Sequence, residues 1–251
     1  MTDAGGERMR LLVSVRSAEE AAAALEGGAD VIDAKEPGLG ALGAVSPAVL
    51  LEIADCVPTG VPLSLALGDL GSPAAVRRAI TQVALARRKA PIYLKLGFGQ
   101  VDSPSEVARL LKSAVLAMGS SLPGGLLIAA AYADHTRAGA LPPAVISSLA
   151  VEAGAAGVLL DTAVKDGRGL LEWLPRPALG QWISEVRGAG LLAALAGSLA
   201  IEVIPLVVSL RPDILGVRGA ACDGGREGRV SPSRVRRLKA RVATSEASLA
   251  I

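Results

Sequence analysis

Short, continuous apolar runs recur along this 251-residue chain about every 20 to 35 positions, and no other pattern in it limits the fold as strongly. Such runs indicate strands buried on both faces, as in a parallel sheet. The expected strands are Leu11–Val15, Val31–Ile32, Leu63–Leu67, Ile92–Leu96, Leu126–Ala131, Val158–Leu160, Leu191–Leu195 and Ile214–Val217.

Stretches of helical length, rich in alanine and leucine, lie between these runs. They include Ala18–Leu25, Ala74–Arg87, Ser105–Met118, Pro142–Glu152, Trp182–Arg187 and Ser233–Val242. Ser17, Ser103-Pro104 and Ser231-Pro232 are typical residues for helix starts. The segment Glu26–Lys35 is echoed by Glu152–Lys165, so one helix-to-strand unit occurs twice.

About eight strands alternating with about eight helices predict a single (β/α)8 TIM barrel over residues 1–251, with residues 1–8 as an N-terminal extension. A doubly wound open sheet is the competing fold. It usually needs fewer strands, and neither Gly68-Asp69-Leu70-Gly71 nor Gly97-Phe98-Gly99 matches the glycine-rich dinucleotide fingerprint.

Composition narrows the function classes. The net charge is +2 and only five residues are aromatic, which argues against a nucleic-acid partner. The two cysteines, Cys56 and Cys222, form neither a disulfide framework nor a zinc motif, so we expect no metal. The longest apolar run, Ala189–Ile201, is shorter than the roughly 18 to 20 residues of a membrane span, and a cytoplasmic protein is expected.

Polar residues and one glycine stand at the carboxyl ends of the predicted strands, which meet at one mouth of a barrel. They are Ser14, Asp33, Lys35, Ser64, Asp69, Lys95, Tyr132, Asp134, Asp161, Lys165, Gly197, Ser198 and Arg218.

Lysine is the informative residue type at this mouth. The chain has only six lysines against 20 arginines, and three of the six, Lys35, Lys95 and Lys165, stand at the carboxyl ends of predicted strands. Unlike arginine, lysine can lose its proton near neutral pH and condense with a carbonyl group. A desolvated amine beside other cations, with Asp33 and Asp161 to move protons, would suit a class I aldolase type of site.

Structural roles for the same residues stay open. Lys95 could merely neutralise a buried aspartate, and Lys35 and Lys165 could be solvated loop residues. Asp33 or Asp161 could bind backbone amides at the mouth instead of taking part in catalysis.

Glycine-rich turns follow the last two predicted strands. Gly197-Ser198 and Arg218-Gly219 resemble the phosphate cradle that barrels often carry there, in which backbone amides and an arginine bind the anion. A phosphorylated substrate is therefore expected. The alternative is a glycine turn with no ligand.

Three other features are given structural interpretations. His135 is expected to be an exposed loop residue and Cys222 a buried one. The late basic cluster is expected to be the solvated face of the final helix, and it comprises Arg226, Arg229, Arg234, Arg236, Arg237, Lys239 and Arg241.

Eight segments together resemble the (5-formylfuran-3-yl)methyl phosphate synthases of methanofuran biosynthesis, from about Met9 to the final helix. Leu-Asp161-Thr-Ala-Val-Lys165-Asp-Gly167 is the most specific of them. The other segments are Leu11–Ser14, Gly27–Pro37, Leu39–Ala44, Tyr93–Gly97, Ala131–Asp134, Leu195–Ser198 and Gly216–Cys222.

The resemblance implies a barrel enzyme that joins two molecules of glyceraldehyde 3-phosphate and eliminates phosphate and water, without a metal or organic cofactor. By the same resemblance, Lys35 is the Schiff-base lysine and Lys95 the proton acceptor, and Asp33, Asp161 and Lys165 are other active-site residues. A second phosphate site is expected near Lys165 and the loop 35–43.

Two other functions are weighed against this one. The chain could be a different Schiff-base aldolase of phosphorylated sugars, or a non-catalytic barrel that binds phosphosugars. Lysines at strand ends argue against the latter. A homo-oligomer is possible, since barrels often pair through their helices.

Overall fold

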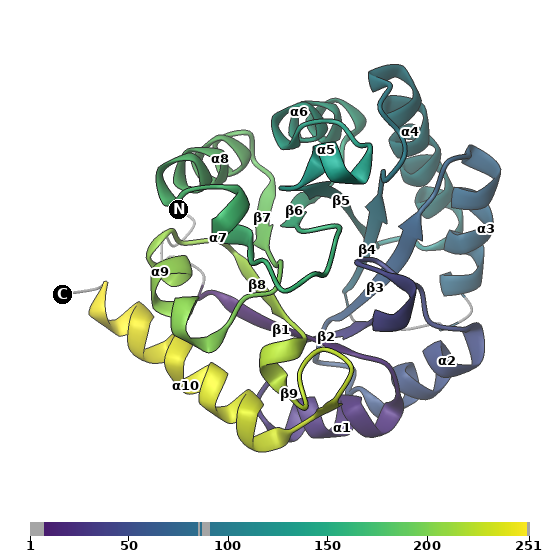
Figure 1. Cartoon of the computed structure of the whole chain (residues 1–251). Coiled ribbons are helices and arrows are strands. Elements are labelled where there is room, and N and C mark those ends of the chain that lie inside the picture. The colour runs from purple at the N-terminus through teal and green to yellow at the C-terminus, as the bar shows by residue number, and fades with distance from the viewer. Residues whose placement is uncertain (1–7, 85, 87–90, 250–251) are drawn as a thin grey trace, which may run out of the picture.

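Eight parallel strands form a closed barrel in the order β1 to β8, and helices surround it (Figure 1). The structure is a computed structural model, and it describes residues 8–84, 86 and 91–249. The expected (β/α)8 architecture is confirmed. Residues 1–7 of the expected N-terminal extension lie outside the described residues, as does Arg87, the expected end of one helix.

The barrel strands are β1 (Arg10–Val15), β2 (Val31–Ala34), β3 (Leu63–Asp69), β4 (Ile92–Gly97), β5 (Leu126–Tyr132), β6 (Gly157–Asp161), β7 (Leu192–Leu195) and β8 (Ile214–Val217). The longer helices are α1 (Ala18–Glu26), α2 (Pro47–Cys56), α3 (Pro73–Ala84), α4 (Pro104–Ser121), α6 (Pro143–Ala153), α8 (Arg176–Gly188), α9 (Ile204–Ser209) and α10 (Pro232–Ser248).

Several connections that follow a strand carry additional short elements. They are η1 (Pro37–Leu39), α5 (His135–Ala138), α7 (Leu170–Trp173), η2 (Ile201–Val203), η3 (Gly219–Ala221) and the hairpin of β9 (Cys222–Asp223) and β10 (Arg229–Val230). Because each of them follows the carboxyl end of a strand, they all build up the same mouth of the barrel.

Helix starts agree with the capping residues in the sequence, although not always through the expected bond. The Ser17 hydroxyl accepts a hydrogen bond from Glu20 N (3.2 Å), which caps α1. Ser103 and Ser231 precede α4 and α10 without capping them, and their hydroxyls pair with those of Ser105 and Ser233. Proline in the first turn supports both of these starts.

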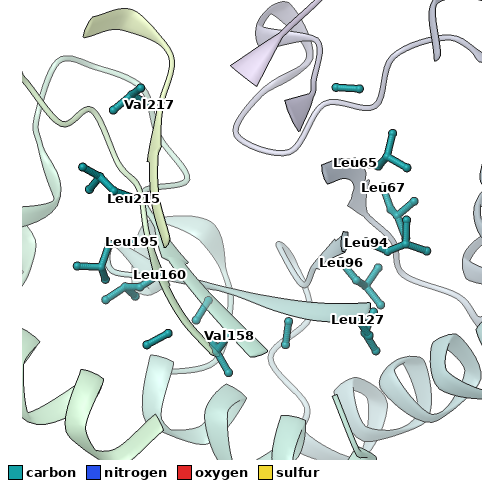
Figure 2. Close-up of a cluster of buried hydrophobic side chains, with 14 of the residues drawn as sticks. Leu65, Leu67, Leu94, Leu96, Leu127, Val158, Leu160, Leu195, Leu215 and Val217 are labelled. Carbon is teal, nitrogen blue, oxygen red and sulfur yellow. The ribbon is translucent and has the colours of Figure 1, made fainter. Parts of the chain in front are cut away.

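Successive side chains of each strand point alternately outward and inward. The outward residues of β3 to β8 form a leucine- and valine-rich layer against the helices (Figure 2). The inward residues form a separate apolar cluster in the barrel that includes Leu12, Tyr93, Ile128, Leu159 and Ile214. Burial on both sides explains why the strands are continuous apolar runs in the sequence.

The last helix closes the ring. Helix α10 packs beside α9 and α1, so the end of the chain covers the seam between β8 and β1 (Figure 1). Among the described residues, no helix is long and apolar enough to cross a membrane.

Candidate active site

A cavity of about 430 Å³ extends from the barrel interior to the carboxyl ends of the strands. Its floor is apolar and its upper part is polar. The polar and charged residues that line it are Ser14, Asp33, Lys35, Ser64, Tyr93, Lys95, Asp161, Lys165, Ser198, Glu202, Arg218, Arg226, Arg234 and Arg237. All five residues expected to be catalytic are in this set.

Strand geometry places the central carboxylate. On β2, Asp33 points inward like Val31, because side chains two residues apart share a face. In the sheet register it lies between Ser14 of β1 and Ser64 of β3. The Ser14 hydroxyl donates to Asp33 Oδ2 at 2.7 Å. Ser64 Oγ is fully buried and has no hydrogen-bond partner among the described residues, so it is available to a bound molecule.

Lys95 and Asp33 form a buried ion pair across the cavity, with Nζ 2.6 Å from Oδ1. Burial alone would raise the pKa of Asp33, but the charges of Lys95 and Lys35 keep it below its ordinary value. Lys95 therefore neutralises a buried aspartate, as one interpretation of the sequence allowed, and the pair also lines the cavity.

A second pair lies at the end of β6. Lys165 Nζ donates to Asp161 Oδ1 (2.7 Å) and to Thr162 Oγ1 (3.1 Å). Burial would raise the pKa of Asp161, but Lys165 and Lys35 hold it below its ordinary value. Asp161 is thus ionised and has a proton donor in contact with it.

Asp134 fixes the loop that carries Lys165. Its buried carboxylate accepts hydrogen bonds from Ala163 N (2.6 Å) and Val164 N (3.0 Å). Both oxygens are used, so the turn between Asp161 and Lys165 is held and Lys165 folds back onto Asp161.

Lys35 differs from the other two lysines. It is 5% exposed, and its Nζ forms no hydrogen bond or ion pair with another described residue. Burial is the main cause that lowers its pKa to about 7. The positive charges of Lys95 and Lys165 also lower this pKa, whereas the negative charges of Asp161 and Asp33 raise it. About half of the Lys35 amine is therefore neutral at pH 7, the form that attacks carbonyl carbon.

The two glycine turns meet at another part of the cavity wall. Gly197 (φ 109°) and Ser198 (φ 50°) follow β7, and Gly219 follows β8. A Cβ at Gly197 would lie 3.2 Å from Thr162 N, in a conformation that disfavours other residues. The N–H groups of Ser198, Leu199 and Gly219 donate to no other described residue, so this wall can bind an anion.

The sequence profile of the 4-HFC-P synthase family matches residues 11–239 of the chain. The chain belongs to this family. It is 38% identical over 233 residues to the (5-formylfuran-3-yl)methyl phosphate synthase of Methanococcus maripaludis strain C7, covering 92% of this chain and 98% of the relative. It is 35% identical to the protein of that name from Methanosarcina mazei, with the same coverage.

Solved structures similar to this member of the 4-HFC-P synthase family are barrels of the same kind. The 3-hexulose-6-phosphate synthase of Salmonella typhimurium has a TM-score of 0.64 at 16% identity and covers 94% of this chain and 100% of its own. The phosphoribosyl anthranilate isomerase of Thermus thermophilus has a TM-score of 0.58 at 20% identity and covers 94% of this chain and 99% of its own. At these identities the likeness concerns the fold alone.

Arg218 was expected to contact substrate phosphate, but in this family member its guanidinium has no N–H left for a ligand. It donates to Glu20 (2.5 and 3.1 Å), to Ser14 O (3.1 Å), to Arg226 O (3.1 Å) and to Gly228 O (2.8 Å). Because these bonds use all five N–H groups, Arg218 joins the β8 loop to α1 and is a structural residue.

The basic cluster near the C-terminus is only partly a solvated helix face. Arg236 is exposed on α10, as expected. Arg226 precedes the helix in the β9–β10 hairpin, and together with Arg234 and Arg237 it lines the cavity. Charge clustering in the sequence does not reveal this arrangement, because it depends on how the hairpin folds back over the barrel.

Other predicted mouth residues have structural partners. The Tyr132 hydroxyl donates to Asp69 Oδ1 (2.8 Å), and Gly99 N donates to the same oxygen (2.7 Å). His135 is half-buried at the start of α5 rather than exposed, and Cys222 is buried as expected. Among the described residues, no three His, Cys, Asp or Glu side chains are grouped as metal ligands.

Proposed function

We propose that the protein is a (5-formylfuran-3-yl)methyl phosphate synthase, which condenses two molecules of glyceraldehyde 3-phosphate through a Schiff base on Lys35. The two trioses give one furan aldehyde with a phosphomethyl group, one inorganic phosphate and two waters. Family membership and the names of the relatives support this product. The site geometry supports the route.

Lys35 begins the reaction. Its neutral amine adds to the aldehyde carbon of the first triose phosphate, and loss of water gives an iminium ion. Removal of the proton on the adjacent carbon yields an enamine, whose carbon attacks the aldehyde of the second triose phosphate. The apolar cavity walls keep the amine partly deprotonated, so it needs no separate base for the first step.

The two carboxylate–lysine pairs move the protons. Lys165 beside Asp161 gives the aldehyde oxygen a proton donor and a carboxylate acceptor at one place. Lys95 with Asp33 forms the equivalent pair across the cavity. Together the two pairs donate and accept the protons that are transferred during loss of phosphate and water, and ring closure follows.

Binding groups lie on either side of these pairs. The N–H groups of Ser198 and Gly219 donate hydrogen bonds to one substrate phosphate. The Ser64 hydroxyl, which has no partner among the described residues, can form a hydrogen bond with a substrate hydroxyl. The observation that carries the proposal is the contrast among three lysines that line the cavity. Two are paired with carboxylates at 2.6 and 2.7 Å, and the third has no partner among the described residues and a pKa of about 7.

The test is product analysis with glyceraldehyde 3-phosphate as the only substrate. We expect a furan absorbance band and one inorganic phosphate released per furan formed. Lys35→Arg should abolish both, whereas Lys112→Arg, on the exposed face of α4, should not. Aldol products without the furan band would support a different aldolase, and unchanged substrate would support a phosphosugar-binding protein; either result overturns the proposal.

A further inference from the structure

Two phosphate-bearing substrates need two anion sites, and the Ser198–Gly219 wall supplies only one. A phosphate dianion in a partly buried site requires a cation that is not already neutralised by a protein carboxylate.

Most cations that line the cavity already have a carboxylate partner. Lys95 pairs with Asp33, Lys165 with Asp161, Arg218 with Glu20 and Arg234 with Asp223, each at 2.7 Å or less. Lys35 is the nucleophile of the proposed reaction. Arg237 lies on the exposed side of α10, where water screens its charge.

Arg226 remains. Its side chain is 22% exposed, and its nearest carboxylate, on the exposed Glu227, is 3.9 Å from Nε. A surface contact of that length neutralises little of the charge. Its Nη2 donates to Pro37 O (3.1 Å) and Gly40 O (2.8 Å), while Nη1 forms no hydrogen bond with a described residue.

The position of Arg226 suits an acceptor substrate. Its guanidinium donates a hydrogen bond to the loop that begins directly after Lys35. It is also close enough to Asp161 for the two opposite charges to attract each other. The predicted second phosphate site also lay beside this loop. Arg218 Nε holds the carbonyl of Arg226 at 3.1 Å, so the hairpin that presents the guanidinium is itself anchored.

We propose that Arg226 binds the phosphate of the second substrate molecule, the aldehyde that the Lys35 enamine attacks. This inference rests on the proposed function. The free Nη1 donates to the phosphoryl oxygens, while Nη2 keeps the loop 36–43 over the mouth. The ligand class is a small phosphorylated aldehyde.

The first test does not depend on the reaction. Inorganic phosphate is titrated into the protein by calorimetry, and the wild type should bind two phosphates. Arg226→Gln should bind one, with the other site weakened about 10- to 100-fold, the usual effect of losing a charge-assisted bond. Arg226→Lys should keep two sites, and Arg236→Gln, an exposed control on α10, should match the wild type. Equal stoichiometry in Arg226→Gln would overturn the proposal.

The second test separates substrate binding from loop support. With glyceraldehyde 3-phosphate and borohydride, Arg226→Gln should still form the reduced adduct on Lys35, because the first substrate is held elsewhere, while furan formation falls about 100-fold. Parallel loss of adduct and furan would mean that Arg226 only positions the loop, and would refute the proposal. If the wild type forms neither adduct nor furan, the proposed function fails, and phosphate stoichiometry alone decides the role of Arg226.

Discussion

Lys95 Nζ lies 2.6 Å from Asp33 Oδ1, and this ion pair is buried at the centre of the barrel mouth. The contact gives Lys95 a carboxylate partner and leaves Lys35, next to the end of β2, as the buried lysine without a partner among the described residues. The division of roles between the two amines therefore follows from which of them has a carboxylate.

Breaking this pair should destabilise the protein. Lys95→Met leaves the Asp33 carboxylate buried without its main counter-charge, at an expected cost of about 3 to 5 kcal/mol in the free energy of unfolding. Adding Asp33→Asn removes the uncompensated charge, so the double variant should recover more than half of the loss. Urea denaturation of the full cycle measures the coupling. Additive effects of the two substitutions would contradict the pairing.

Lys35 should destabilise the fold in a pH-dependent way. Its pKa is about 7 in the folded protein against an ordinary value of 10.5, so the folded state binds fewer protons between these values. Stability of the wild type therefore rises with pH across this window, and the full cost of burying the charge is present below pH 7.

Lys35→Met removes that cost and should be more stable than the wild type by about 2 to 4 kcal/mol at pH 6, with a smaller gain at pH 9. Urea denaturation at the two pH values measures the difference. The control Lys112→Met, on the exposed face of α4, should change stability by less than about 0.5 kcal/mol at both. A loss of stability in Lys35→Met at pH 6 would show instead that Lys35 is charged and stabilising in the folded state.

Arg218 should stabilise the folded protein through its buried ion pair with Glu20. Burial would raise the pKa of Glu20, but its hydrogen bond with Arg218 keeps that pKa below its ordinary value. Arg218→Gln and Glu20→Gln should each cost about 3 to 5 kcal/mol, since each leaves one buried charge unpaired. Thermal and urea denaturation measure both. If Glu20→Gln were as stable as the wild type, Arg218 would have to be reconsidered as a phosphate ligand.

Asp134 should act on turnover without touching substrate. Asp134→Asn keeps one oxygen acceptor for the N–H groups of Ala163 and Val164 and loses the other, so Lys165 is placed less well on Asp161. We expect kcat to fall about 10-fold or more with little change in KM, while trapping at Lys35 stays within a few-fold.

The matched control is Asp166→Asn on the same loop, where the carboxylate forms half-exposed contacts with Arg137 and Arg168. It should leave kcat within about two-fold of the wild type, because such pairs contribute little. An equal fall in kcat for both variants would show that any change in the loop impairs the reaction, and that Asp134 has no specific positioning role.

The apolar runs predicted the barrel because its strands are buried on both faces, but they were less reliable at strand ends. The run at Val31–Ile32 was too short, and β2 continues to Ala34. Its extra residues include Asp33, which is polar because it faces the cavity. Because Asp33 is polar, it interrupts the apolar run, and the end of β2 cannot be predicted from that run.

The two arginines near the site show what sequence could not predict. Arg218 stands at a strand end and looked like a phosphate ligand, but its guanidinium turns to Glu20, which is 198 positions away in the chain. Arg226 looked like part of a solvated basic segment, but the hairpin carries it to the cavity. Position along a strand predicts which residues are near the mouth, whereas distant partners decide where long side chains point.

Borohydride trapping with glyceraldehyde 3-phosphate, followed by mass mapping of peptides across a pH series, identifies the Schiff-base lysine itself. We expect the added mass of one reduced triose phosphate on Lys35, with a trapping rate that rises with pH and is half-maximal near the pKa of about 7. Added mass on Lys95 or Lys165 instead, or no added mass at any pH, would contradict it.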